Sequence, residues 1–174
     1  MKVIRSNKKG FRIHSPFVYG LVTGVLYDDF ININFTGTGI LQSAKQVQLN
    51  MLCRLLHYFH PEKVFFSNQL TVEIEKKLKD SVCSDFFYSE TFESDLEETI
   101  LSFPFAVLSE SVFYRLTRFP ENNSVWFIKK NPRSGGSIFQ NLPECESGRI
   151  TIELKSFGIV IFNNKFYTQG YVIK

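Results

Sequence analysis

Polar side chains that could take part in chemistry follow two short apolar runs of this 174-residue chain. Ser67 and Asn68 come directly after the run 63–66, and Ser109 comes directly after the run 105–108. A strand that is buried on both faces has such a continuous apolar sequence. A polar turn between a buried strand and a helix is where α/β folds hold a nucleotide. These three side chains are therefore the first candidates for a ligand site.

Charged residues form a second set of candidates. Glu90 ends another strand-like segment, and Lys129 and Lys130 follow a later one. With Arg133 and the backbone of Gly135–Gly136, the two lysines could form a nest that binds an anion. The alternative for this basic segment is a solvated loop without a ligand.

The elements that must position these residues are arranged around the segment 50–80. An apolar stripe with helical spacing precedes Pro61, which cannot continue a helix. The run 63–66 follows as a strand, and a second helix is expected over Leu70–Lys79. The stripe that identifies the first helix consists of Met51, Leu52, Leu55, Leu56 and Phe59. Strand, turn and helix in this order form the first half of a βαβ unit.

The remaining pattern extends this unit to a larger sheet. Ser15 followed by Pro16 predicts the start of a helix that runs to Tyr27. Further helices are expected at 41–60, 95–101 and 112–119, and further strands at 85–90, 105–108, 124–128, 149–154, 157–162 and 166–173. This order predicts an α/β fold with a Rossmann-like, doubly wound sheet. The sheet should be mostly parallel, with a C-terminal antiparallel hairpin and an N-terminal helical extension.

Charge is distributed unevenly along the chain. The formal net charge is +3, but residues 1–14 hold five basic residues and no acid, so the rest of the chain is slightly acidic. A nucleic-acid-binding domain usually carries a basic face over its fold. The pattern therefore disfavours nucleic-acid binding and indicates a solvated basic arm at the N-terminus.

Cysteine count and hydropathy restrict the kinds of site and the cellular location that can be expected. The three cysteines are widely separated, which argues against a disulfide framework and against a zinc site. No apolar run reaches the roughly 18 residues that a membrane span needs. A cytoplasmic protein without a membrane segment is expected.

With these residues in this order, the chain resembles the class I S-adenosylmethionine-dependent methyltransferases. More narrowly, it is similar to a group of small bacterial methyltransferase-like proteins, through the motif His14–Phe17 and the strand pair 149–154 and 157–162. The resemblance implies a basic arm and helical extension over 1–48 and a methyltransferase-like domain over 49–174. It also implies S-adenosylmethionine as the cofactor of the family.

The segments that would hold this cofactor depart from the family pattern. In the family, the first strand leads into an acidic, glycine-rich loop, because the backbone must approach the cofactor closely. Here the turn 67–70 has neither glycine nor acid, and no glycine occurs between Ile40 and Ser134. Glu90 matches either the ribose-binding acid after the second strand or the end of the third. Acids after the fifth strand are replaced by Lys129 and Lys130.

These departures favour a degenerate relative, a pseudoenzyme without bound cofactor that acts as a binding or interaction protein. Ser67, Asn68, Glu90 and Ser109 would then mark a vestigial cofactor crevice, filled by side chains such as Phe66, Leu70 and Phe87. A homo-oligomer or a protein partner is expected. The alternative is an active small-molecule methyltransferase with an atypical cofactor loop, in which His14 or Glu110 would act as the base.

Overall fold

The structure is a computed structural model that describes residues 3–6, 13–27, 43–89, 95–120, 123–131, 136–139, 142 and 148–173. Its strands are β1 (Val3–Ser6), β2 (Lys63–Phe66), β3 (Asp85–Tyr88), β4 (Phe105–Ser109), β5 (Ser124–Lys129), β6 (Arg149–Glu153), β7 (Phe157–Phe162) and β8 (Gln169–Ile173). Its helices are α1 (Pro16–Leu21), the π-helix η1 (Val22–Leu26), α2 (Ser43–Phe59), α3 (Val72–Ser81), α4 (Leu96–Ser102) and α5 (Glu110–Phe113).

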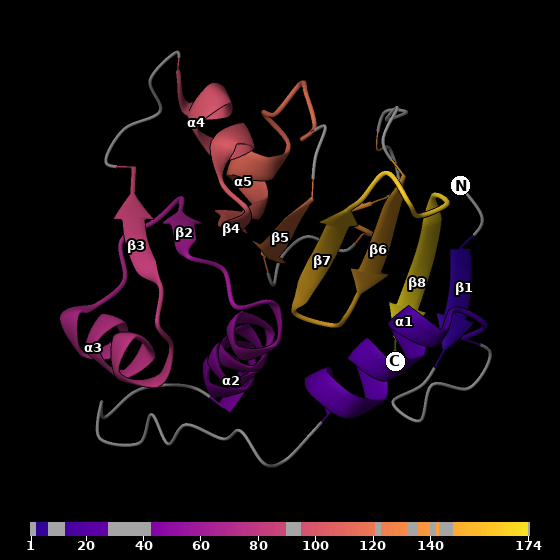
Figure 1. Ribbon diagram of the computed structural model, residues 1–174, viewed down its shortest axis with the longest axis horizontal. Coiled ribbons are helices and arrows are strands. Elements are labelled where there is room, and N and C mark those ends of the chain that lie inside the picture. The colour runs from indigo at the N-terminus through magenta and orange to yellow at the C-terminus, as the bar shows by residue number, and fades with distance from the viewer. Residues whose placement is uncertain are drawn as a thin grey trace.

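The eight strands form one sheet in the order β1-β8-β6-β7-β5-β4-β2-β3 (Figure 1). β7 lies between β5 and β6 and is antiparallel to both. The other pairs in this sheet are parallel. The prediction of an α/β fold with a mostly parallel sheet and an antiparallel hairpin near its end is therefore confirmed.

Helices cover the sheet on both faces, so the protein has three layers (Figure 1). One face packs against α1, η1, α2 and α3 around a cluster that includes Val64, Phe127 and Ile159. The other face packs against α4 and α5 around a second cluster that includes Trp126 and Phe139. Neighbouring residues of a strand point to opposite faces, which explains why the central strands are apolar throughout.

The first helix begins as predicted and changes its form before its expected end. Ser15 caps it, because the Ser15 hydroxyl accepts from the Val18 N–H at 3.4 Å. From Val22 onward the chain continues as the π-helix η1. The guanidinium of the buried Arg54 donates to the Leu26 carbonyl at 2.7 Å and so satisfies the end of η1.

The N-terminal arm differs from the expectation at residues 3–6. These residues form β1, which pairs in parallel with β8, so the prediction of a solvated arm is wrong there. The backbone groups of an edge strand are a template for further pairing, and β8 offers them to this segment. The division of the chain into 1–48 and 49–174 stays a prediction.

Several element boundaries differ by a few residues from those predicted. Helix α3 begins at Val72 rather than Leu70, because the Thr71 hydroxyl accepts from the Ile74 N–H and caps the helix. The last strand begins at Gln169 rather than Phe166, whose N–H donates to the Asn163 carbonyl at 3.0 Å in a turn. Among the helices in the described ranges, none has the length and apolar character to cross a membrane.

Candidate functional site

The direction in which successive strands are added to the sheet reverses between β2 and β4. From β2 the chain moves to β3 on one side and then returns to β4 on the other side of β2. Ligands of doubly wound sheets bind outside the carboxyl ends of the strands at such a switch point. Ser67, Asn68 and Ser109, the candidates from the sequence, are brought together here.

The two loops at this switch point are hydrogen-bonded to each other. The Ser67 N–H donates to the Val107 carbonyl at 2.9 Å, which continues the ladder beyond β2. The Ser109 N–H donates to the Ser67 hydroxyl at 2.9 Å, and that hydroxyl donates to the Asn68 side-chain oxygen at 3.0 Å. The loops are therefore held together at the point where a crevice would require them to separate.

The side chain of Ser109 has a local structural role. Its hydroxyl accepts from the Val112 N–H at 3.4 Å and so caps the short helix α5. It also shares a hydrogen bond of 3.0 Å with the Ser111 hydroxyl. These contacts engage Ser109 as an N-cap.

A cavity of about 460 Å³ lies beside these loops, and we call it the switch-point cavity. Its uncharged polar lining consists of Asn68, Ser109, Ser111 and Asn131. Its ionisable lining consists of Glu110, Tyr114, Lys129 and Lys130. The lining residues follow or end β2, β4 and β5, so the cavity lies along the carboxyl edge of the parallel strands.

The prediction that side chains fill this crevice is wrong, because the cavity adjoins Asn68. Phe66 packs instead within the core between Phe86 and Tyr88, with ring centroids 5.1 and 5.5 Å away. Phe87 is 41% exposed and packs on Phe103. Period-two alternation turns Phe87 to the opposite face from Phe66, so the two cannot fill one space.

Glu110 is a buried carboxylate at the cavity wall. Its Oε2 accepts from the Asn131 N–H at 2.5 Å. The pKa of Tyr114 is raised, chiefly because the phenol is partly buried. The charge of Glu110, a hydrogen bond to Glu110 and the charge of Glu153 raise it further, in that order. Tyr114 is therefore a neutral phenol at neutral pH, and Glu110 is engaged as an acceptor.

Lys130 is paired with an acid across the cavity wall. Its ammonium lies 2.7 Å from Glu153, and the two side chains are only 13% and 7% exposed. Glu153 also accepts from the Ser137 hydroxyl and from the Ile138 N–H, the latter at 3.3 Å. One of the lysines predicted to bind an anion is thus already neutralised, whereas Lys129 is exposed at the cavity.

Several predicted site residues cannot be placed in the cavity. Glu90, Arg133 and Gly135 lie outside the described residues. Gly136 is exposed. His14, a candidate base, is exposed just before α1 and lines neither this cavity nor the next.

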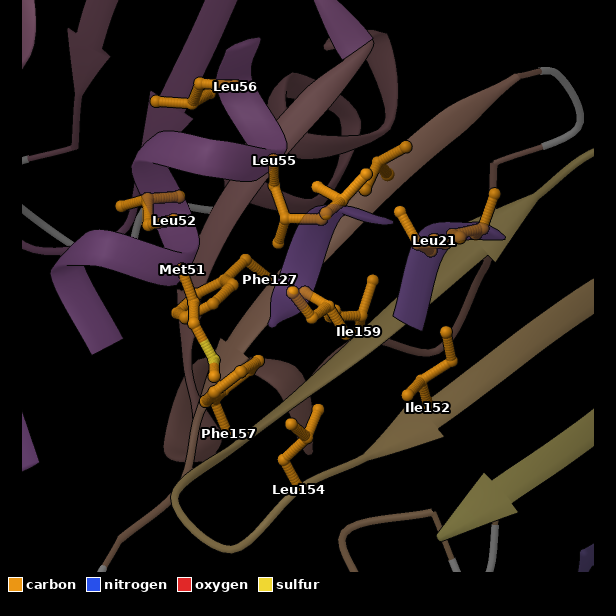
Figure 2. Close-up of a cluster of buried hydrophobic side chains, with 14 of the residues drawn as sticks. Leu21, Met51, Leu52, Leu55, Leu56, Phe127, Ile152, Leu154, Phe157 and Ile159 are labelled. Atoms are coloured by element: carbon orange, nitrogen blue, oxygen red, sulfur yellow. The ribbon is translucent and has the colours of Figure 1, made fainter. Parts of the chain in front are cut away.

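A second cavity, of about 570 Å³, was not predicted from the sequence. We call it the apolar cavity, after the lining side chains Tyr27, Val47, Met51, Leu154, Phe157 and Ile173. Lys130, Glu153 and Lys155 form its polar end. Figure 2 shows Met51 of α2 directed toward Phe157 and Leu154 of the β6–β7 hairpin. Both strands of the hairpin are buried along their whole length, the polar positions of β6 included, and their sequence carries no signal that they leave space beside α2.

Acids elsewhere in the described part of the chain do not form a metal site. No three His, Cys, Asp or Glu residues within the described ranges are grouped as metal ligands would be. Glu97 and Glu98 lie in the first turn of α4, where carboxylates favour the helix dipole.

The arrangement can hold a ligand, and Glu110, a candidate base from the sequence, lines the switch-point cavity. The Ser109 hydroxyl bonds to the Ser111 hydroxyl and accepts from the Val112 N–H, and no histidine is among the described lining residues of either cavity. Serine needs an adjacent base to act as a nucleophile. No protein-family model, no curated protein and no solved structure matches this chain.

Proposed function

We propose that this chain is a non-catalytic relative of the class I S-adenosylmethionine-dependent methyltransferases and acts by binding a ligand or partner. The order β3-β2-β4-β5 follows that of a doubly wound sheet around its switch point. β3 is the direct neighbour of β2, the position of a second strand in that order. A third strand beyond β3 has no counterpart among the described strands.

The observation that carries the proposal is the hydrogen bond from the Ser109 N–H to the Ser67 hydroxyl, which we call the tie between Ser67 and Ser109. A cofactor in the switch-point crevice needs free backbone N–H groups and close approach of the loop. Here the N–H groups of both serines donate within the protein, at 2.9 Å each. The turn offers no glycine that would bring the backbone closer.

Charge gives this cofactor no support at the switch point. S-adenosylmethionine carries a sulfonium cation, which acidic side chains would stabilise. Among the described lining residues the one carboxylate is Glu110, which accepts from the Asn131 N–H. Lys129 is exposed in the same lining, and Glu153 neutralises Lys130, so the described lining does not favour a cation.

An active small-molecule methyltransferase is the second candidate. The open cavity beside Asn68 favours it, because a ligand could enter there and reach Glu110. This candidate requires the tie between Ser67 and Ser109 to break when the cofactor binds.

Calorimetric titration with S-adenosylmethionine and S-adenosylhomocysteine separates the two candidates. We expect no heat and no thermal shift at millimolar ligand. Micromolar binding that is lost in Asn68→Ala would overturn the proposal in favour of the enzyme. The matched control is Asn164→Ala, an exposed residue in the turn after β7, which should leave any such binding unchanged.

The predicted anion site is tested in the same cavity with inorganic phosphate. If phosphate binds and Lys129→Ala removes the binding, the bound ligand of this non-catalytic protein is an anion. Because Glu153 neutralises Lys130, we expect phosphate to bind weakly.

A further inference from the structure

The walls of the apolar cavity have the composition of a small-molecule site. Met51, Leu154, Phe157 and Ile173 line it, and each is at most 7% exposed. Its volume of about 570 Å³ lies within the range of roughly 300–1,000 Å³ typical of ligand pockets. Such pockets combine mostly apolar walls with a few polar groups that orient the ligand.

The rim of this cavity is held by hydrogen bonds. The Ser156 carbonyl accepts from the Gln48 amide at 2.8 Å and from the Lys130 N–H at 3.1 Å. The Leu154 N–H donates to the Phe157 carbonyl at 2.9 Å within the same turn. The β6–β7 turn is thus fixed to both α2 and the end of β5. A ligand would therefore meet a preformed cavity, which lowers the entropic cost of binding.

Among the described lining residues, the polar end of the cavity has more basic than acidic groups. Lys130 and Lys155 line it together with one acid, Glu153. Glu153 already accepts from Lys130, Ser137 and Ile138. Lys155 is exposed at the rim, and within the described residues no carboxylate is paired with it. An anionic group on a ligand would pair with this lysine.

We infer that the apolar cavity binds a small carboxylic acid with an apolar body, its carboxylate at Lys155 and its body against Met51 and Phe157. The inference rests on the proposed binding function and gives it a ligand class. A cation would be repelled by Lys155, whose charge is not offset as that of Lys130 is by Glu153, and a neutral ligand would gain no charge pairing from Lys155. A polyphosphate would place charge against apolar walls.

The test is calorimetry with three probes that share an eight-carbon chain: octanoate, 1-octanol and octyltrimethylammonium. We expect octanoate to bind about tenfold more tightly than 1-octanol, since a charge-assisted pair is stronger than a neutral hydrogen bond. The ammonium probe should give no heat. Equal binding of the three probes, or no heat from octanoate at millimolar concentration, would overturn the inference.

Two variants localise the binding. Lys155→Ala should weaken octanoate binding several-fold and leave 1-octanol unchanged. Val47→Trp should fill the cavity and abolish binding of both probes, with little risk to the fold because Val47 is 47% exposed. Its matched control is Val72→Trp on α3, at a position that is 85% exposed and outside the cavity. Octanoate binding that survives Val47→Trp would contradict the inference.

Sedimentation of the same proteins tests another occupant. One outcome would overturn the inference: the wild type is a dimer, Val47→Trp is a monomer, and octanoate does not bind. In that case the cavity is an interface between two copies of the chain. The cofactor titration remains separate from this outcome. Binding of S-adenosylmethionine alongside octanoate would overturn only the non-catalytic proposal, and binding of neither would overturn only the present inference.

Discussion

The two cavities lie along the same edge of one sheet, yet their linings are opposite in character. The switch-point cavity lies above the parallel strands β2, β4 and β5, and polar groups that bond to one another line it. The apolar cavity lies at the β6–β7 hairpin and the end of β8, and buried hydrocarbon lines it. Lys130 contributes to both.

This difference concerns what each lining leaves available to a ligand. At the switch point, where the sheet topology favours a ligand, the chain satisfies its own donors and acceptors. Beside the hairpin, apolar surface remains open to a cavity. Burial of apolar surface is the larger source of binding free energy, so we expect the second region to bind a ligand more tightly than the first. The variants below test this comparison.

Loss of Glu153 should have the largest effect, because it breaks the ion pair between the two cavities. Glu153→Ala leaves Lys130 charged and only 13% exposed. Breaking a buried pair in this way costs about 3–5 kcal/mol, which urea unfolding measures. The control is Glu73→Ala, which removes an exposed pair with Lys77 at 3.6 Å and should cost less than about 0.5 kcal/mol. Equal costs would show that the pair is not structural.

Phe157→Ala compares the cavities directly. Phe157 is 1% exposed and stacks on Phe127 with ring centroids 4.8 Å apart, so we expect a loss of about 3 kcal/mol in unfolding free energy. Its counterpart in the switch-point cavity is Tyr114→Ala, at a position that is 59% exposed, with a loss of about 1 kcal/mol or less. Thermal or urea unfolding of both variants measures the two losses of unfolding free energy. A larger loss for Tyr114→Ala would reverse the comparison.

Ser67→Ala tests the tie at the switch point. The substitution leaves the Ser109 N–H without its acceptor at 2.9 Å, which should cost about 1–2 kcal/mol. Ser111→Ala, an exposed hydroxyl in the same cavity, is the control and should cost only a few tenths of a kcal/mol. Hydrogen exchange of the Ser109 amide gives a second measurement. Unchanged protection of that amide in Ser67→Ala would rule out the tie.

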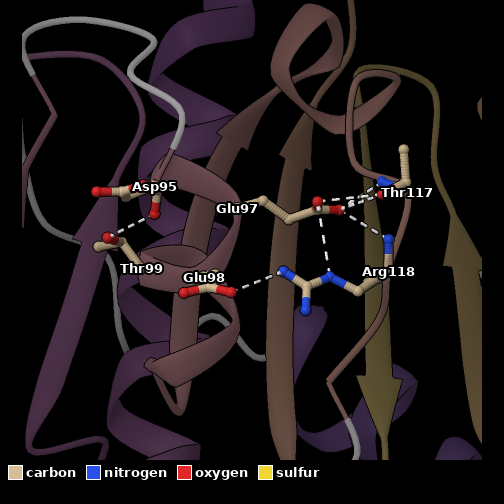
Figure 3. A network of polar contacts seen from close by, with 6 residues as sticks. All are labelled: Asp95, Glu97, Glu98, Thr99, Thr117 and Arg118. Atoms are coloured by element: carbon tan, nitrogen blue, oxygen red, sulfur yellow. Dashed lines mark hydrogen bonds and ion pairs between the residues drawn. The ribbon is translucent and has the colours of Figure 1, made fainter.

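A carboxylate outside both cavities provides the smallest expected effect, and it depends on pH. The backbone N–H groups of Thr117 and Arg118 donate to Glu97 at 2.5 and 2.7 Å (Figure 3). Partial burial acts to raise the pKa of Glu97, but the hydrogen bonds from Arg118 and Thr117 outweigh it and lower the pKa. The stabilisation is therefore complete above the unfolded pKa of about 4.3 and is lost as pH falls through the folded value.

We thus expect Glu97→Gln to cost about 1 kcal/mol at neutral pH and nothing in acid below the folded pKa. Unfolding at both pH values measures the difference. Glu98→Gln, whose side chain is 74% exposed beside Arg118, should change little at either pH. A cost for Glu97→Gln that persists in strong acid would show that packing, rather than the charge, is responsible.

Much of the fold could be predicted because buried strands leave a clear apolar signal. The runs 63–66 and 157–162 are strands with the predicted bounds. β1 was missed, because residues 3–6 are stabilised as a strand by the distant β8. Asn68 and Ser109 could be placed together from the sequence because each comes at the end of a predicted parallel strand. The ion pair of Lys130 and Glu153 could not be predicted, because neither local sequence indicates that the other segment lies beside it.

The sequence by itself determined the class of fold, its central strands and the absence of a glycine-rich turn after β2, because these depend on residue type and local spacing. Only the tertiary structure decided which loops bond to each other and where space remains. The tie between Ser67 and Ser109 depends on the register of β2 against β4. The apolar cavity depends on how α2 and the hairpin pack, since the contacts that leave a void join residues far apart in the chain.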